Sequence, residues 1–210
     1  PIDYAVARQW YEKAAASGDT NAMIRLGYLE ERGFGLTQNI ENARKWYEKA
    51  VASGDASGSI RLASLDVTAA MVGGRYEEAS RLMDQLIASV ERAETEDIGR
   101  PGPITAQALG RQAWISLFAR RFDVALAAAE RVDLIAPGRL IAKLDKAHAL
   151  IFLGRVEEAL ALHRSHKGQR LPGYENRLWE ELTRDNFRRL RDAGLGIAAM
   201  DDVERVLAGS

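Results

Sequence analysis

Residues 7–19 read ARQWYEKAAASGD, and residues 43–55 read ARKWYEKAVASGD. The two stretches lie 36 residues apart, and 11 of their 13 positions are identical. At the same offset, residues 24–27 (IRLG) align with residues 60–63 (IRLA). Self-similarity at a fixed period of about 20–50 residues is typical of repeat architectures, in which each repeat is one supersecondary unit. The sequence therefore predicts an array of stacked repeats.

Each repeat has the pattern of two helices. Apolar and small residues in 23–28 and in 43–50 follow the i, i+3, i+4 spacing of one helical face. Ser-Gly-Asp at 17–19 and again at 53–55 closes each second helix. The glycine can take the left-handed conformation after a helix end, and the aspartate can cap the helix that follows. These signals predict helix-turn-helix units.

The loop between the two helices of the first complete unit is residues 32–36, RGFGL. Together with Leu26-Gly27 and the segment 43–50, this loop resembles the Sel1-like repeat, a subfamily of the tetratricopeptide-repeat superfamily. The resemblance implies packing roles for the aromatic pairs at 10–11 and 46–47. It also implies an array of helix hairpins whose first helices line a concave face.

The spacing between paired small residues divides the chain into two kinds of repeat. Close approach of two helices needs a small side chain on each, and the candidate pairs are Gly27 with Ala43, Ala63 with Ala79, Ala113 with Ala125, and Ala147 with Ala159. The first two pairs are separated by 16 residues and the last two by 12. The shorter spacing, with 34 residues between Ala125 and Ala159, resembles ordinary tetratricopeptide repeats.

We therefore predict an all-α fold: a right-handed α-solenoid of about five helix-turn-helix repeats with a C-terminal capping helix pair. Residues 1–172 form the repeat array, Sel-like over 1–104 and tetratricopeptide-like over 105–172. Residues 173–210 form the cap of the same domain, with an amphipathic helix over 174–191 and a short helix over 199–207.

Residues 1–17 resemble the second helix of a repeat whose first helix is missing. We therefore expect upstream sequence. In bacteria, proteins that resemble this one carry such repeats behind a signalling or peptidase domain. The resemblance thus implies that the chain is the C-terminal part of a larger bacterial protein.

Composition excludes several classes of protein. The chain has 210 residues, 47 % of them hydrophobic, with 29 Lys and Arg against 30 Asp and Glu. This balance is unlike that of disordered chains and gives no global attraction to nucleic acid or anionic membranes. The chain has no cysteine, which excludes disulfides and thiolate metal sites. A cysteine-free chain is compatible with the cytoplasm and with the periplasm. No apolar stretch reaches the ~18 residues of a membrane span.

We expect no catalytic site, no cofactor and no small-molecule substrate. The chain has no Gly-rich phosphate loop and no strand-to-helix serine elbow. An alternative is a zinc site at His163 and His166, which are three residues apart and follow Glu157 and Glu158. We favour a solvated helix end for the two histidines and predict no metal.

Helix phase identifies candidate groove residues on the predicted first helices. Positions next to the small contact residues should point into the concave face. Trp114 is the strongest candidate, because an exposed tryptophan in a groove is typical of a binding hot spot. The full set is Tyr28, Glu31, Ser64, Arg111, Trp114, Phe118, Asp145 and His148.

These observations favour a non-catalytic protein–protein interaction module that binds a peptide or helix of a partner protein in its groove. The alternative is a nucleic-acid-binding helical array. It would use the basic stripe Arg164–Arg191, in which 8 cations exceed 4 carboxylates by 4 charges. We favour the protein partner, because Trp179 and Phe187 in that stripe lie on its apolar face and are unavailable to stack on bases.

Overall fold

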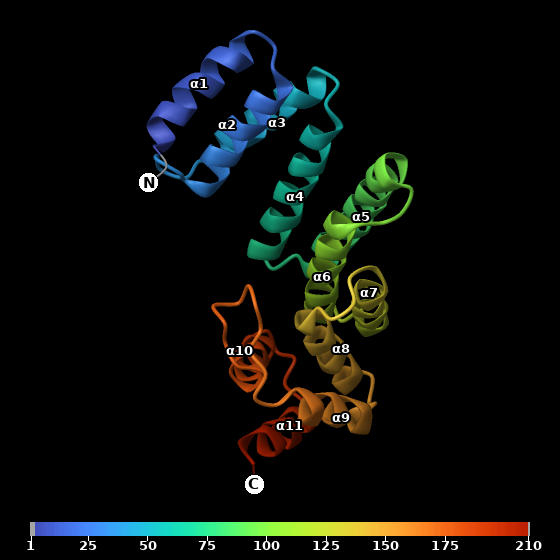
Figure 1. Cartoon of the computed structure of the whole chain (residues 1–210). Helices are drawn as coiled ribbons and strands as arrows, with labels where there is room; N and C mark the ends of the chain where they lie inside the picture. The colour runs from blue at the N-terminus through green and yellow to red at the C-terminus, as the bar shows by residue number, and fades with distance from the viewer. Residues whose placement is uncertain (1–2, 210) are drawn as a thin grey trace. The chain divides into compact units, whose positions relative to one another are not determined.

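The structure is a computed structural model that describes residues 3–209, except the side chain of residue 56. These residues form eleven α-helices and no strand, apart from an isolated bridge between Arg170 and Leu178. The helices are α1 (Tyr4–Ala16), α2 (Thr20–Arg32), α3 (Ile40–Ala52), α4 (Ala56–Val72), α5 (Tyr76–Ile98), α6 (Pro103–Phe118), α7 (Phe122–Ile135), α8 (Leu140–Phe152), α9 (Val156–His166), α10 (Trp179–Asp192) and α11 (Ala198–Ala208). The predicted all-α class is confirmed (Figure 1).

The chain divides into two compact units, Pro1–Gly73 and Gly74–Ser210. The first contains α1 to α4, and the second contains α5 to α11. This division lies at a different place from the predicted change of repeat type between residues 104 and 105. The repeat type of residues 56–104 stays a prediction. The predicted ranges start at residue 1 and end at residue 210, which lie outside the described residues.

In the first unit, consecutive helices pack as antiparallel neighbours, α1 on α2, α2 on α3 and α3 on α4. The predicted caps are present. Asp19 accepts a hydrogen bond from the Ala22 N–H at 3.1 Å, and Asp55 accepts one from the Ser57 N–H at 2.8 Å. Gly18 and Gly54 both have positive φ, as the Ser-Gly-Asp motif predicts. Capping aspartates satisfy backbone donors that a helix start leaves without partners.

The small residue in the middle of α2 makes room for a buried tyrosine of α3. A Cβ added to Gly27 would lie 2.7 Å from Cδ1 of Tyr47. Tyr47 is completely buried and donates its hydroxyl to Glu31 Oε2 at 2.7 Å. Burial, together with that hydrogen bond, raises the pKa of Tyr47 well above its ordinary value, so the phenol stays neutral. The close approach that was predicted between Gly27 and Ala43 is therefore an approach of Gly27 to the ring of Tyr47.

The aromatic pairs of the two repeats are not packed alike. Trp46 packs on a small apolar cluster that includes Ala15 and Met23. Trp10, its counterpart one repeat earlier, is 66 % exposed, with Lys13 over its ring. The prediction that both tryptophans fill the core is wrong for Trp10, because the described residues that pack on α1 leave this face of the helix open.

The connections explain the two spacings of small residues. Seven residues, 33–39, join α2 to α3, whereas the connections at 119–121 and 153–155 have three. The connection between α4 and α5, residues 73–75, also has three residues. Its spacing of 16 between Ala63 and Ala79 comes instead from α4, which continues for nine residues after Ala63, whereas α6 continues for five after Ala113.

In the second unit, a buried carboxylate fixes the connection between α5 and α6, residues 99–102. Glu94 of α5 accepts hydrogen bonds from the backbone N–H groups of Gly102, Ile104 and Thr105 at 2.7–3.0 Å. Burial opposes ionisation of this group, but these hydrogen bonds outweigh it and lower the pKa of Glu94. Glu94 thereby caps the first turn of α6, which has no side-chain cap at its own N-cap residue.

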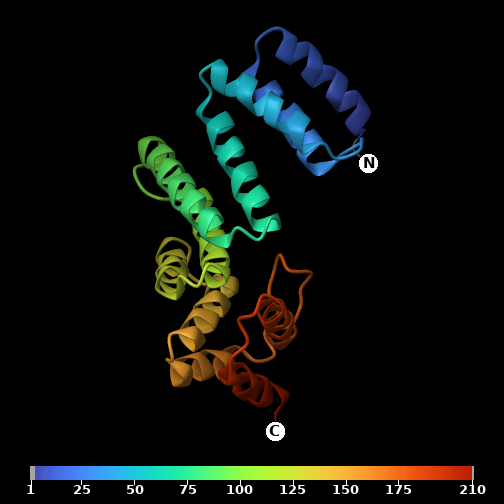
Figure 2. The ribbon, with the colours of Figure 1, turned by 180° about the vertical axis from the view of Figure 1, so that it is seen from behind.

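The C-terminal helices cover more of the second unit than an end cap would. The helix predicted to begin at residue 174 begins at Trp179, because residues 171–177 form turns in which Glu175 and Asn176 have positive φ. α11 packs on α9, as a cap should. α10 instead packs across α8 and α6. The ring centroids of Phe187 and His148 lie 5.2 Å apart, and the guanidinium group of Arg189 lies over the Trp114 ring. Figure 2 shows this arrangement from behind.

Candidate functional site

The predicted groove residues of the first unit are partly engaged with their own unit. Tyr28 is half-buried, with Phe34 edge-on at 5.8 Å and the guanidinium groups of Arg32 and Arg61 over its ring. Glu31 accepts the hydroxyl hydrogen bond from Tyr47, which gives it a structural role. Ser64 is half-buried on α4.

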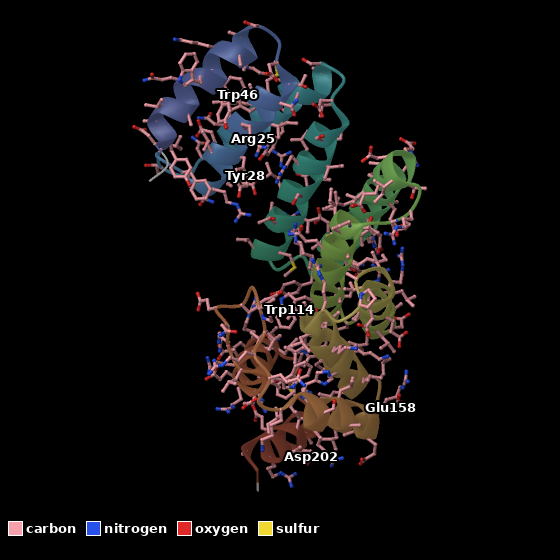
Figure 3. All side chains as sticks on the ribbon, viewed as in Figure 1. Arg25, Tyr28, Trp46, Trp114, Glu158 and Asp202 are labelled. Atoms are coloured by element: carbon pink, nitrogen blue, oxygen red, sulfur yellow. The ribbon has the colours of Figure 1, made fainter. Side chains whose placement is uncertain are left out.

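Three of the predicted groove residues of the second unit line one cavity. Arg111 and Trp114 of α6 and Asp145 of α8 border a pocket of about 370 Å³. α10 supplies a further wall through Leu182, and Tyr174 of the preceding loop also borders the pocket. Figure 3 labels Trp114, which lies on the side of α6 that meets α10. A concave site of this size, with aromatic and apolar walls and a few polar groups, is the usual form of a binding site.

Two polar side chains that border this pocket are buried without partners. Asp145 is 4 % exposed and Asn186 of α10 is 6 % exposed. Within residues 3–209, neither side chain takes part in a hydrogen bond or ion pair. Burial raises the pKa of Asp145 well above its usual range. Burial also raises the pKa of the neighbouring Tyr174, and the charge of Asp145 adds to that shift. Buried polar groups are nearly always hydrogen-bonded, so the two groups have unused capacity.

The rim of the pocket is basic. Arg111, Arg139 and Arg189 border it, against the single carboxylate of Asp145. Arg189 lies 4.9 Å from the Trp114 ring centroid. Within the described part of the chain, neither Arg139 nor Arg189 forms an ion pair with a carboxylate. The pocket therefore combines an apolar interior, two buried polar groups and a cationic edge.

The basic stripe Arg164–Arg191 is partly neutralised. Arg177 contacts Asp185 at 2.6 Å, Arg188 contacts the same carboxylate at 3.1 Å, and Arg191 contacts Glu204 at 2.9 Å. Three of its eight cations are thus already paired with carboxylates. This pairing lowers the charge that the stripe offers to phosphates.

Phe118 lies beside the pocket instead of inside it. Its ring is 5.0 Å from Trp114 and 5.2 Å from Tyr76 of α5, so three aromatic rings form a row. Phe118 borders a second, more open hollow together with Tyr76 and Arg120. Phe118 therefore packs edge-on against the Trp114 ring.

The structure corrects the predictions for two histidines. His148 is completely buried between Trp114, His163 and Phe187, so it does not line a groove. The physical reason is α10, which covers the face of α8 that the sequence leaves open. His163 is also completely buried, and its Nδ1 accepts a hydrogen bond from Trp179 Nε1 at 2.9 Å. It is a core residue and lies at no solvated helix end.

Two features are absent from residues 3–209. These residues contain no cluster of three or more His, Asp or Glu side chains that could hold a metal ion. No helix among them combines the length and the hydropathy that a membrane crossing requires.

Comparison with known proteins identifies the repeats. Residues 1–19 and 20–55 match the family model of the Sel1 repeat. The N-terminal part of the chain, residues 1–55, therefore matches the Sel1 repeat. This confirms the resemblance that the periodicity and the motifs indicated, and Sel1 repeats are generally modules for protein–protein interaction. No curated protein matched the chain.

Two solved structures resemble this chain. The crystal structure of a Sel1 repeat protein from Oxalobacter formigenes has a TM-score of 0.50 and 18 % identity, over 98 % of this chain and 78 % of that one. A protective antigen of uropathogenic Escherichia coli strains, described as displaying an SLR fold, has a TM-score of 0.44 and 22 % identity, over 98 % of this chain and 49 % of that one. The first of these supports a Sel1 repeat solenoid fold.

Sequence reasoning missed the pocket residues outside α6 and α8. Asn186 and Arg189 come from the helix taken as an end cap, and Tyr174 lies in a segment predicted to be helical. The amphipathic pattern of residues 178–190 indicates that α10 packs on something apolar, but not on which face of the array.

Proposed function

We propose that this chain is a non-catalytic protein-interaction module and that its second unit binds a segment of a partner protein in the Trp114 pocket. The observation that supports this proposal is the cavity of about 370 Å³ with Trp114 in its wall. Tryptophan in a concave, mostly desolvated site is the residue type that most often dominates binding energy. The generally non-catalytic, scaffolding role of Sel1-like and tetratricopeptide-like repeats agrees with it.

The partner class follows from the shape and polarity of the pocket. A volume of about 370 Å³ lies near the lower end of ligand pockets, which suits one large side chain better than a whole helix. α10 already covers much of the first-helix face. An extended peptide that inserts one side chain therefore fits this site better than the partner helix that the sequence also allowed.

A displayed library of random peptides tests this proposal. The purified chain should enrich a family of peptides, and Trp114→Ala should weaken their binding at least about tenfold, because truncating a hot-spot residue costs ~2 kcal/mol or more. Trp10→Ala is the matched control, since Trp10 is an exposed tryptophan in the other unit. It should leave binding unchanged.

Two outcomes would count against the proposal. One is a library that yields no enriched peptide, and the other is enriched peptides that bind Trp114→Ala as well as the native chain. Tight binding of single-stranded RNA that falls steeply with salt would instead favour the nucleic-acid alternative.

A further inference from the structure

Two polar side chains at the pocket form no hydrogen bond within the described part of the chain. Asp145 comes from α8 and Asn186 from α10, and both border the cavity while being more than nine-tenths buried. Neither side chain forms a hydrogen bond or ion pair within the described residues, so both are available to a ligand group placed in the cavity. Asp145 offers acceptor oxygens, and Asn186 offers both amide donors and an acceptor oxygen.

The cavity that these two side chains border also has apolar and aromatic walls. Trp114, Ile141 and Leu182 border the same cavity. A ligand group that fills it must therefore have a large apolar body and a polar tip that both donates and accepts a hydrogen bond. Among protein side chains, tyrosine has this form, because its ring is apolar and its hydroxyl is donor and acceptor at once.

The rim adds a second requirement. Arg139 and Arg189 are exposed and without carboxylate partners in the described residues, and Arg111 borders the same opening. Two other arginines of α10, Arg188 and Arg191, are paired with carboxylates. Guanidinium groups favour carboxylates, with which they form charge-assisted hydrogen bonds. Acidic residues beside the inserted side chain would therefore find partners at the rim.

We infer that the Trp114 pocket recognises a tyrosine flanked by acidic residues in an extended segment of the partner protein. The tyrosine hydroxyl donates to Asp145 and accepts from the Asn186 amide, while the flanking carboxylates meet Arg139 and Arg189. This inference rests on the proposed function and specifies its ligand. A phosphorylated tyrosine does not fit, because its charge would be desolvated beside Asp145.

Short labelled synthetic peptides test the inference by fluorescence anisotropy. The probes share one length and carry either tyrosine or phenylalanine at the centre, with glutamates or lysines on both sides. The tyrosine–glutamate peptide should bind about tenfold or more tighter than the phenylalanine–glutamate peptide, because the latter leaves both polar groups unpaired. It should also bind several-fold tighter than the tyrosine–lysine peptide.

Two variants test which residues cause the preference for tyrosine and the preference for glutamate flanks. Asp145→Leu should bind both glutamate peptides about equally, and it should fold, because it removes a buried carboxyl that has no partner. Circular dichroism checks that it does. Arg139→Gln, at an exposed position, should reduce the preference for glutamate over lysine flanks several-fold and leave the preference for tyrosine intact.

Three results would overturn the inference: equal affinity for the tyrosine and phenylalanine peptides, a tyrosine preference that survives in Asp145→Leu, or no binding of any probe at millimolar concentration. None of these affects the library experiment. Enriched peptides that need Trp114 but contain no acidic-flanked tyrosine would keep the proposed function and remove this inference.

Discussion

Acidification of the Asp145→Asn variant from pH 7.5 to pH 5 is expected to cost its second unit about 4 kcal/mol of folding free energy, about 2 kcal/mol for each of two buried histidines. Burial lowers the pKa of His148 well below its ordinary value and lowers the pKa of His163 to about 3. Both are neutral in the folded chain, whereas the unfolded chain binds their protons below about pH 6.5. The folding free energy that the two neutral histidines contribute is therefore fully present above pH 6.5 and is lost as the pH falls below that value.

Asp145 acts in the opposite direction and must be removed from the measurement. Its pKa is raised by burial, so the folded chain holds its proton to higher pH than the unfolded chain does. Acidification toward the ordinary aspartate pKa therefore stabilises the fold through this group. The expected loss of about 4 kcal/mol is accordingly for Asp145→Asn, which carries no ionisable group at this position.

Hydrogen exchange of the α8 and α9 amides, corrected for the intrinsic rate at each pH, measures this loss. Adding His148→Leu to Asp145→Asn should halve it, because only His163 then titrates. The surroundings of the histidines support these assignments: His148 faces Trp114, His163 and Phe187, and His163 faces Trp179 and Phe187. If the double variant lost as much stability as Asp145→Asn, the assignment to His148 would be wrong.

Gly27→Ala is expected to destabilise the first unit by about 1–3 kcal/mol, the usual cost of overpacking a filled core. The substitution is otherwise favourable by up to ~1 kcal/mol, since alanine is the better helix former. The added Cβ would enter the ring of Tyr47, which is completely buried and held by its hydrogen bond to Glu31. The ring cannot move aside without losing that bond, so the steric cost should win.

Gly110→Ala is the matched control. Gly110 also lies inside a helix, α6, but a Cβ there would meet no atom within 4 Å. This variant should keep or raise stability, so the two glycines should respond with opposite sign. Urea unfolding followed by hydrogen exchange reports the first unit through the α2 and α3 amides and the second unit, for Gly110→Ala, through the α6 and α7 amides. Stability of Gly27→Ala equal to or above that of the native chain would contradict the close approach of α2 to Tyr47.

The repeated segments predicted local structure well because their signals are local. Asp19 and Asp55 cap their helices as the motif predicts, and Gly18 and Gly54 take the left-handed conformation that it requires. Each of these features depends on atoms within a few residues. Because the motif recurs 36 residues later, the same cap and the same glycine conformation are predicted for both repeats.

The candidate site was predicted only in part, because it depends on contacts between distant segments. Trp114 and Asp145 were found from helix phase, whereas the burial of His148 follows from Phe187, 39 residues later in the chain. Trp10 shows the same limit in the first unit. Its local sequence matches that around Trp46, yet only Trp46 is packed by neighbouring residues.

The insertion of a partner side chain beside Trp114 is tested most directly by the indole N–H signals of the four tryptophans in a ¹H–¹⁵N spectrum. During titration with the tyrosine–glutamate peptide, or with a library-enriched peptide, the Trp114 signal should shift in a saturable way. The signals of Trp10 and Trp46, in the other unit, should stay in place. A saturable shift at Trp10 or Trp46 with no change at Trp114 would contradict the account.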